Sequence, residues 1–168
     1  MTPLVSIIMG STSDLPVMEK AARQLDELAI PFEILALSAH RTPDEVAEFA
    51  RGAEERGVRV IIAGAGMAAH LCGVIASMTP LPVIGVPIKA TLDGMDALLA
   101  IVQMPPGIPV ATVGINGAQN AALLAAQMLS LGDADLMKRL KAFKDGLKEK
   151  VVRANADLKE IKYSFKTN

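Results

Sequence analysis

Short apolar runs alternate with longer amphipathic segments along almost the whole chain. The runs are rich in Val, Ile and Leu and are bounded by Gly, Pro or Ser, as buried strands are. They predict strands at 4–9, 31–37, 58–63, 81–86 and 109–115. The segments between and after them, with apolar residues at helical spacing, predict helices at 15–28, 43–56, 68–78, 93–102, 118–131 and 134–162.

Strands that are apolar on both faces and alternate with helices specify a parallel sheet covered on both sides. Five such units predict an α/β fold, a three-layer doubly wound sheet of flavodoxin-like order 2-1-3-4-5, followed by a long C-terminal helix. No linker, internal repeat or low-complexity segment interrupts the pattern, so residues 1–168 are predicted to form one domain. In this topology ligands bind beyond the carboxyl ends of the strands, at the switch point between the first and third strands.

Two C-terminal segments indicate a homo-oligomer. Helix 118–131 has almost no polar face, and an all-round apolar helix must be covered on every side, whereas a sheet covers only one. Residues 133–168 carry ten Lys or Arg and six Asp or Glu, a net charge of +4 against −5 for the rest of the chain. We expect residues 134–168 to be a helical extension that faces other subunits.

The composition excludes several classes of partner. The net charge of −1, and a basic tail without interleaved aromatic residues, argue against nucleic-acid binding. No segment reaches the ~18 uncharged apolar residues of a membrane helix. The first residues lack the basic region of a signal peptide, so we expect a cytoplasmic protein. Cys72 is the only cysteine, and with His40 and His70 it offers too few soft ligands for a structural zinc site, so no metal is expected.

The loop after the second predicted strand, 38–41, carries the sharpest chemical signal. The following stretch, 42–45, matches a capping box with Pro at the first helical position, which places the loop against a helix N-terminus. His40 and Arg41 in that loop suggest a proton-transfer group beside an anion clamp. A surface histidine and arginine in a solvated loop would fit the same residues equally well.

The loop after the first strand suits a phosphorylated ligand. Ser11 and Ser13 can donate hydroxyl and backbone N–H groups to a phosphate at a helix N-terminus. Asp14 either caps helix 15–28, the commoner role, or accepts hydrogen bonds from ribose hydroxyls. It cannot fully serve both purposes.

The third loop, 64–70, is rich in glycine. Its start, Gly64–Ala69, formally matches G-x-G-x-x-G/A, but no acidic residue ends the next strand as a dinucleotide site requires. We therefore interpret these glycines as positions where a ligand approaches the backbone closely. His70 is either a hydrogen-bonded, partly buried histidine or a catalytic group. Residues 103–107 lie at the end of the sheet opposite to these three loops. They either are a plain connector or cover a site in an adjoining subunit.

Absent motifs narrow the class of function further. The chain has no G-x-x-x-x-G-K-[ST] loop for a nucleoside triphosphate and no G-x-S-x-G nucleophile elbow. An FMN site usually needs aromatic rings around the flavin, and none of the Phe or Tyr residues lies in the three loops. We therefore expect no flavin cofactor.

Five motifs together resemble the PurE family of purine biosynthesis, at 9–14, 38–44, 64–73, 81–87 and 101–107. The resemblance runs almost without gaps from Val5 to Leu131. Segments 38–42 and 68–71 are similar to the bacterial mutase class rather than to the class that uses free CO2. The resemblance implies an octameric 5-(carboxyamino)imidazole ribonucleotide mutase, an isomerase that moves a carboxylate from the exocyclic nitrogen to ring carbon C4 without metal or ATP.

The resemblance also implies a role for each matching residue. The carbamate releases CO2, which stays trapped until C4 attacks it, and one histidine can deliver and remove the proton. We predict His40 for that role, with His70 as a second catalytic residue at the carboxylate end. The implied substrate-binding residues are Ser11, Ser13, Asp14, Ser38, Ala39, Arg41, Gly64, Ala65, Gly66, Ala69 and Leu71.

Two positions depart from the family pattern, and two other functions remain open. The family usually has glycine where this chain has Met67, and proline where it has Cys72, so the shape of the pocket is in question. We expect Cys72 to be a small buried hydrophobe. The alternative functions are the free-CO2 carboxylase of the same family and a non-catalytic module that binds a ribonucleotide or FMN.

Overall fold

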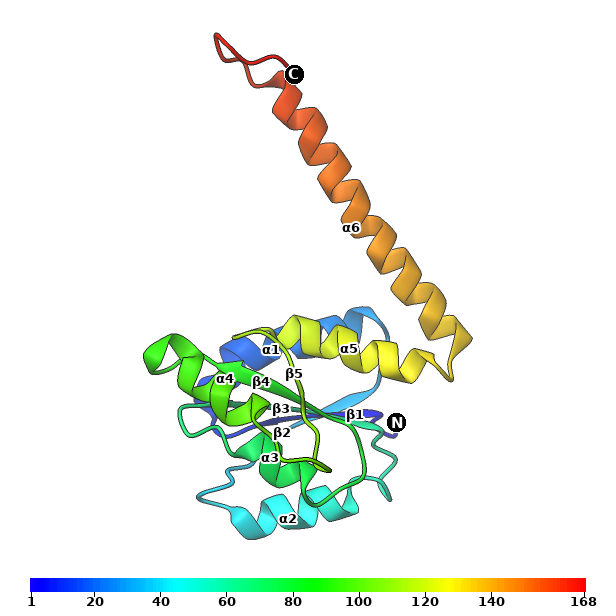
Figure 1. Cartoon of the computed structure of the whole chain (residues 1–168). Helices are drawn as coiled ribbons and strands as arrows, with labels where there is room; N and C mark the ends of the chain where they lie inside the picture. Colours follow the sequence, from blue (N-terminus) through cyan, green and yellow to red (C-terminus); the bar gives the residue numbers. More distant parts are fainter.

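A five-stranded sheet lies between two layers of helices in the computed structural model, which describes all 168 residues (Figure 1). All strand pairs are parallel and the order is β2-β1-β3-β4-β5, so the predicted α/β flavodoxin-like fold is confirmed. The elements are β1 (Val5–Met9), the 3-10 turn η1 (Thr12–Asp14), α1 (Leu15–Glu27), β2 (Phe32–Ala36), α2 (Pro43–Gly52), β3 (Val60–Gly66), α3 (Leu71–Ala76), β4 (Val83–Ile88), the 3-10 turn η2 (Leu92–Gly94), α4 (Met95–Val102), β5 (Ala111–Thr112), α5 (Ala118–Ser130) and α6 (Ala134–Glu160).

The helices cover both faces of the sheet. Helices α1 and α5 lie on one face, and α2 and α3 lie on the other, where the buried side of α4 joins the same core (Figure 1). The two cores hold 21 and 16 buried residues, so neither face is left to solvent. Strands β1 and β4 are buried at every position, which explains why their sequences are apolar on both faces rather than alternating. The one polar residue, Ser6 of β1, is buried, and its hydroxyl donates to Oε1 of Glu33 at 2.6 Å.

Strands β3 and β4 extend beyond their predicted ends. Residues 64–66 pair with residues 86–88. The start of the glycine-rich stretch, which we expected to be a loop, therefore lies in a strand. A Cβ on Gly64 would lie 2.4 Å from Sδ of Met18 and 3.1 Å from Cδ1 of Ile88. The interpretation of Gly64 as a position of close ligand approach gains no support from the structure, because a side chain at this position would point into the core.

Three other elements are shorter than predicted. Helix α2 ends at Gly52, and the chain turns through Gly57, which has a φ of +92°. Helix α3 starts only at Leu71, because Met67 has a φ of +55° and residues 67–70 form a turn. Strand β5, at the edge of the sheet, contains two residues instead of seven.

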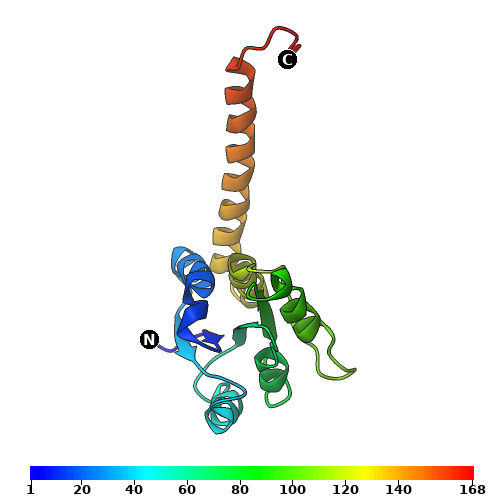
Figure 2. The same ribbon diagram turned by 90° about the vertical axis from the view of Figure 1, so that its left-hand side faces the viewer.

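Helices α5 and α6 differ in how they are covered. Helix α5 packs against α1 and α6 as well as the sheet, so our premise that only a neighbouring subunit could cover its second side is wrong. Helix α6 contributes Leu136 and Leu140 to the core, and its remaining turns project away from the body (Figures 1 and 2). None of the helices combines the length and apolar character needed to cross a membrane.

Candidate functional site

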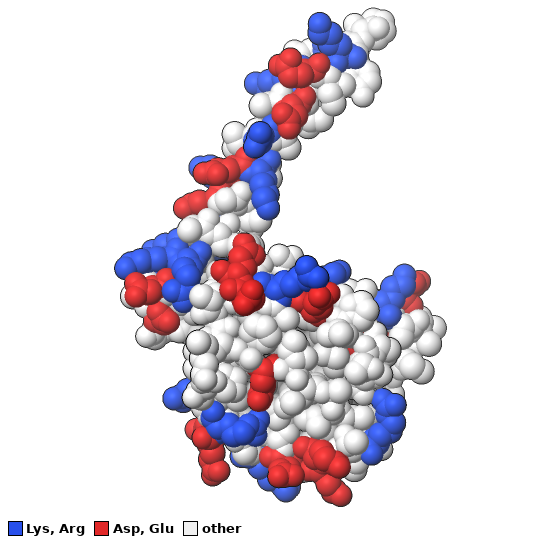
Figure 3. All heavy atoms as spheres, turned by 180° about the vertical axis from the view of Figure 1, so that it is seen from behind, with Lys and Arg blue, Asp and Glu red and all other residues white.

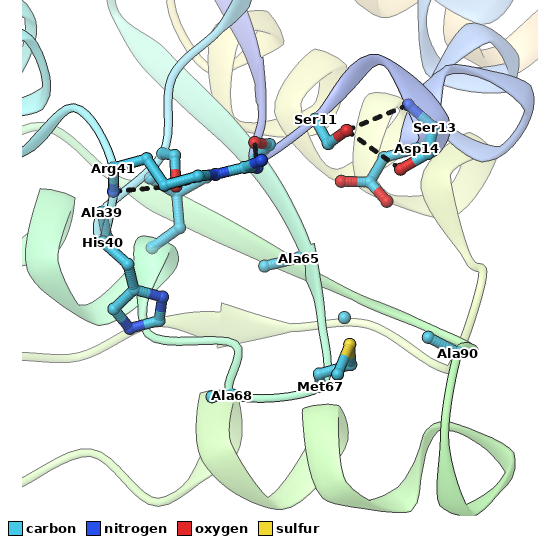
Figure 4. A pocket seen from close by; sticks show the side chains of 14 residues that line it. Ser11, Ser13, Asp14, Ala39, His40, Arg41, Ala65, Met67, Ala68 and Ala90 are labelled. Carbon is cyan, nitrogen blue, oxygen red and sulfur yellow. Dashed lines mark hydrogen bonds between the residues drawn. The ribbon is translucent and has the colours of Figure 1, made fainter.

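A cavity of about 540 Å³ lies at the carboxyl ends of β1, β2 and β3 (Figure 4). Met9 at the end of β1 pairs with Ala36 of β2 and with Gly64 of β3, so the chain leaves the three strands at neighbouring points. The cavity therefore occupies the switch point of the sheet, where ligands bind in folds of this topology. Its lining residues are Gly10, Ser11, Ser13, Asp14, Ser38, Ala39, His40, Arg41, Ala65, Gly66, Met67, Ala68, Leu71 and Ala90.

Most of the predicted site residues line this cavity. The structure brings together Ser11, Ser13, Asp14, Ser38, Ala39, His40, Arg41, Ala65, Gly66 and Leu71. His70 reaches the site through a contact with His40. Gly64 and Ala69 do not line the cavity; Gly64 faces core side chains, and Ala69 is fully buried.

The sequence prediction missed Gly10, Ala68 and Ala90 as lining residues. Gly10 and Ala68 directly adjoin predicted positions in the chain. Ala90 follows β4, whose carboxyl end lies beside that of β3 in the parallel sheet. The rule that ligands bind beyond the carboxyl ends of strands, applied to β4 as well, would have found Ala90.

The loop between β2 and α2 is held closed by Ser38 and Thr42. The Thr42 N–H donates to the Ser38 carbonyl oxygen at 2.9 Å, and the Thr42 hydroxyl accepts from the Ser38 N–H at 2.9 Å. Thr42 occupies the N-cap position of α2, but its side chain makes no capping hydrogen bond, so the predicted capping box is wrong. Its hydroxyl fixes the loop instead, and this fixes the backbone that carries His40 and Arg41.

Arg41 presents its charge to the cavity without an acidic partner. Its Nη2 donates to the carbonyl oxygen of Gly10 at 2.8 Å, and its Nε donates to Oγ of Ser38 at 3.3 Å (Figure 4). All four ion pairs of the chain involve other residues. A guanidinium oriented by neutral oxygens and left without a carboxylate is suited to bind an anionic group of a ligand.

The segment from Ser11 to Asp14 faces Arg41 across the top of the cavity (Figure 4). The backbone N–H and hydroxyl of Ser13 both donate to Oγ of Ser11, at 3.3 and 3.0 Å. Asp14 stands at the N-cap position of α1, yet its side chain makes no capping hydrogen bond, so capping is not its role. Its carboxylate therefore remains available to a ligand.

Burial shapes the acidity of Asp14. It raises the pKa of the carboxyl above its usual value, because removal from water disfavours the charged form. The backbone of Ser11 and the positive charge of Arg41 oppose this rise and only partly offset it. Asp14 is thus a partly buried carboxyl group, and its side chain is not used to cap α1.

His40, which lines the cavity, forms a pair with His70, which lies outside the lining. Nε2 of His40 lies 2.8 Å from Nδ1 of His70, and the two rings meet edge to face with centroids 5.0 Å apart. Both side chains are exposed, so the alternative of His70 as a partly buried histidine is wrong. One nitrogen of the contact must accept the hydrogen bond, and therefore at least one of the two rings is neutral.

Other chemical groups lie outside the site. Cys72 is fully buried, as predicted, and its Sγ contacts the carbonyl oxygen of Ala63 at 3.2 Å. Burial raises the pKa of this thiol to about 12, so Cys72 carries no thiolate at neutral pH. No three His, Cys, Asp or Glu side chains lie close enough together to hold a metal ion.

Comparison with known proteins agrees with this fold. A family model described as AIR carboxylase matches residues 4–150. The chain belongs to the AIR carboxylase family. The crystal structure of Treponema denticola PurE2-S38D superposes with a TM-score of 0.86 at 31% sequence identity, and the match covers 95% of this chain and 100% of that one. The predicted membership of the PurE family is therefore confirmed.

Two relatives within the AIR carboxylase family carry the same name. The N5-carboxyaminoimidazole ribonucleotide mutase of Pyrococcus horikoshii is 58% identical over 160 residues, which cover 95% of this chain and 90% of the relative. The enzyme of that name from Thermotoga maritima is 55% identical over 162 residues, covering 96% and 95% of the two chains.

Proposed function

We propose that the protein is an N5-carboxyaminoimidazole ribonucleotide mutase of purine biosynthesis. It converts 5-(carboxyamino)imidazole ribonucleotide into 4-carboxy-5-aminoimidazole ribonucleotide, in the cytoplasm and without a cofactor. One observation carries the proposal: a single cavity is lined both by His40, whose imidazole contacts that of His70, and by the guanidinium of Arg41, which has no acidic partner. Relatives of that name, 55 to 58% identical over nearly the whole chain, support it.

The lining of the cavity orients the substrate. Its phosphate lies beside Arg41, where Ser13 and Ser38 supply hydroxyl groups. Its ribose hydroxyls face Ser11 and Asp14, since a carboxylate accepts two hydrogen bonds from such a diol. The aminoimidazole ring then points along the mostly apolar wall 65–71 toward the two histidines.

His40 moves the one proton that the reaction requires. The bond between the exocyclic nitrogen and the carboxylate breaks, CO2 departs, and the nitrogen keeps the electron pair and takes a proton from His40. Carbon C4 then attacks the CO2 carbon, and the proton on C4 passes to His40, which restores the starting charge. Substrate and product are isomers, so no oxidant, reductant or net proton is consumed.

His70 supports this exchange by its hydrogen bond to His40. The bond restrains the His40 ring, which is otherwise exposed and free to rotate on a loop. It also gives the proton a second nitrogen 2.8 Å away. A pair that shares one proton can act as an acid in the first step and as a base in the second.

Incubation of the purified full chain with each candidate substrate tests this function. A mutase converts the carboxyamino ribonucleotide at low CO2, whereas a carboxylase needs aminoimidazole ribonucleotide and free CO2, and mass spectrometry of the product separates them. Product that forms only from aminoimidazole ribonucleotide and CO2 would contradict the mutase assignment. A yellow protein would favour the FMN module, although the cavity is lined by no aromatic ring other than that of His40.

We also propose that α6 packs on other copies of the chain in an octamer. The apolar stripe that begins with buried Leu136 and Leu140 continues outward through Leu147, Val151 and Leu158, which are 46%, 63% and 53% exposed. A 27-residue helix is ~40 Å long, and an unpacked helix is marginally stable in water. Figure 3 shows charged groups on α6 separated by uncharged surface, consistent with a helix that has one face to bury.

A further inference from the structure

Met67 is the one long apolar side chain that is exposed on the wall of the cavity. It is 57% exposed, whereas the other apolar lining residues are alanines and Leu71, which is 3% exposed. Figure 4 shows its sulfur directed into the cavity, on the side opposite Asp14. A ligand that fills the cavity therefore meets the thioether of Met67.

The backbone of Met67 is strained. Its φ of +55° lies in the left-handed region, which L-residues with a β-carbon enter at a cost and which glycine normally occupies. The turn is fixed by two hydrogen bonds of 2.8 Å, from the N–H of Ala69 to the Met67 carbonyl and from the N–H of His70 to the Ala68 carbonyl. Strain of this kind persists where the surrounding structure imposes it, and such residues are frequent at functional sites.

The same turn joins Met67 to the reacting groups. His70 follows three residues later, and its ring contacts His40. The rigid backbone from 66 to 70 therefore holds the thioether and the imidazole pair on one wall of the cavity. Only the side chain of Met67 is free to move, and its three rotatable bonds let it adapt to what is bound.

We propose that Met67 retains CO2 during the reaction, as a movable apolar cover over the reacting end of the cavity. This inference rests on the proposed mutase function. CO2 is small, uncharged and held by no covalent bond between the two steps, so it is kept only by walls that exclude water and close the exit. An unbranched thioether can pack over such a molecule, whereas the alanines around it are too short. The family usually has glycine at this position, so the cover is a feature of this chain and not of the family.

Three substitutions distinguish an effect of the Met67 side chain from an effect of its strained backbone. Met67→Ala removes the cover but keeps a β-carbon and the strained φ. Met67→Gly removes both the cover and the strain. Met67→Leu keeps an apolar side chain of similar volume, and the chain already tolerates leucine at positive φ, since Leu92 has a φ of +44°.

Loss of label from the substrate measures retention directly. Wild type and variants, in excess over substrate, receive carboxyamino ribonucleotide with a ¹³C carboxylate in a large pool of unlabelled CO2, and mass spectrometry gives the ¹³C fraction of the product. We expect wild type and Met67→Leu to keep the label, while Met67→Ala and Met67→Gly lose it several-fold more often and accumulate aminoimidazole ribonucleotide.

Three outcomes would overturn the inference, and they are distinct. Full retention of label by Met67→Ala and Met67→Gly, with normal turnover, removes Met67 from this role and leaves the mutase function intact. Loss of label by Met67→Gly alone assigns the effect to the backbone and also overturns the inference. Absence of turnover by the wild type overturns the proposed function itself.

Discussion

His40 and His70 share one hydrogen bond, of 2.8 Å from Nε2 to Nδ1, although 30 residues separate them in the chain. Because His40 is the group proposed to deliver and remove the proton, we expect His40→Asn to lower kcat by about 10²–10⁴-fold, the usual contribution of a general acid–base group. The dissociation constant of the substrate should change little, since Arg41 and Asp14 remain. Steady-state kinetics measures kcat, and calorimetric titration measures the dissociation constant.

His70→Asn serves as the matched comparison. It leaves the reacting imidazole in place and removes only its partner, so we expect a smaller loss of kcat than for His40→Asn. Equal losses would mean that the two rings act as one unit. Near-normal turnover of His40→Asn would remove His40 from the proposed mechanism.

Arg41→Ala is expected to weaken binding more than turnover. A hydrogen bond to a charged group contributes about 1.5–3 kcal/mol, so the dissociation constant should rise roughly 10- to 100-fold. The effect should shrink at high salt, because the contact is between charges. Arg23, which is exposed on α1 and pairs with Glu19, offers a control of equal charge outside the cavity. A dissociation constant for Arg41→Ala equal to that of Arg23→Ala would contradict the phosphate assignment.

Asp14→Asn is expected to stabilise the fold while weakening substrate binding. The folded protein raises the pKa of Asp14, so the ionised carboxylate lowers stability above that pKa, and this cost disappears at low pH where the group is protonated. The variant should therefore unfold at a higher temperature than wild type near pH 7, and the gap should close toward pH 4. Partial exposure limits the gain to less than about 1 kcal/mol, or up to roughly 3 °C in Tm. Thermal unfolding from pH 4 to pH 8 measures the difference in Tm between the variant and wild type. A difference that grows as the pH falls would contradict this prediction.

The fold and the position of the site could be predicted because both depend on local pattern. The run that became β1 is apolar apart from Ser6 and specified a strand buried on both faces, and alternation with helices specified a parallel sheet. That topology placed the loops after β1 and β2 at one switch point. It therefore predicted that Ser11, Asp14, His40 and Arg41 would share a cavity.

The remaining features depend on contacts between distant segments. Gly64 looked like part of a ligand loop, and only its pairing with Val86 and its packing against Met18 make it a strand residue. The Thr42 hydroxyl could have capped α2, but in the closed loop it accepts a hydrogen bond from the Ser38 N–H instead. The bond between His40 and His70 and the positive φ of Met67 have no signature in the one-dimensional pattern.

Two glycines of the sheet should tolerate alanine differently. A Cβ on Gly85 would lie 2.4 Å from Cγ2 of Ile101 and 3.0 Å from Cγ1 of Val110, both on stiff β-branched side chains. At Gly64 the nearest atom is the sulfur of flexible Met18. Overpacking of a core costs roughly 1–3 kcal/mol, and we expect Gly85→Ala near the top of that range and Gly64→Ala near the bottom. Chemical denaturation measures both, and the reverse order would refute this explanation.

Val151→Asp should break up the proposed oligomer. Val151 lies on the exposed apolar stripe of α6, where a buried carboxylate without a partner would be costly at an interface. Ala156, exposed on the opposite side of the same helix, provides the matched control Ala156→Asp. Light scattering of the wild type and of the control should give about eight times the 17.7 kDa of one chain, and the Val151 variant a smaller mass. If Val151→Asp keeps the wild-type mass, the stripe is not the subunit contact, because an unpaired charge there could not be buried without cost.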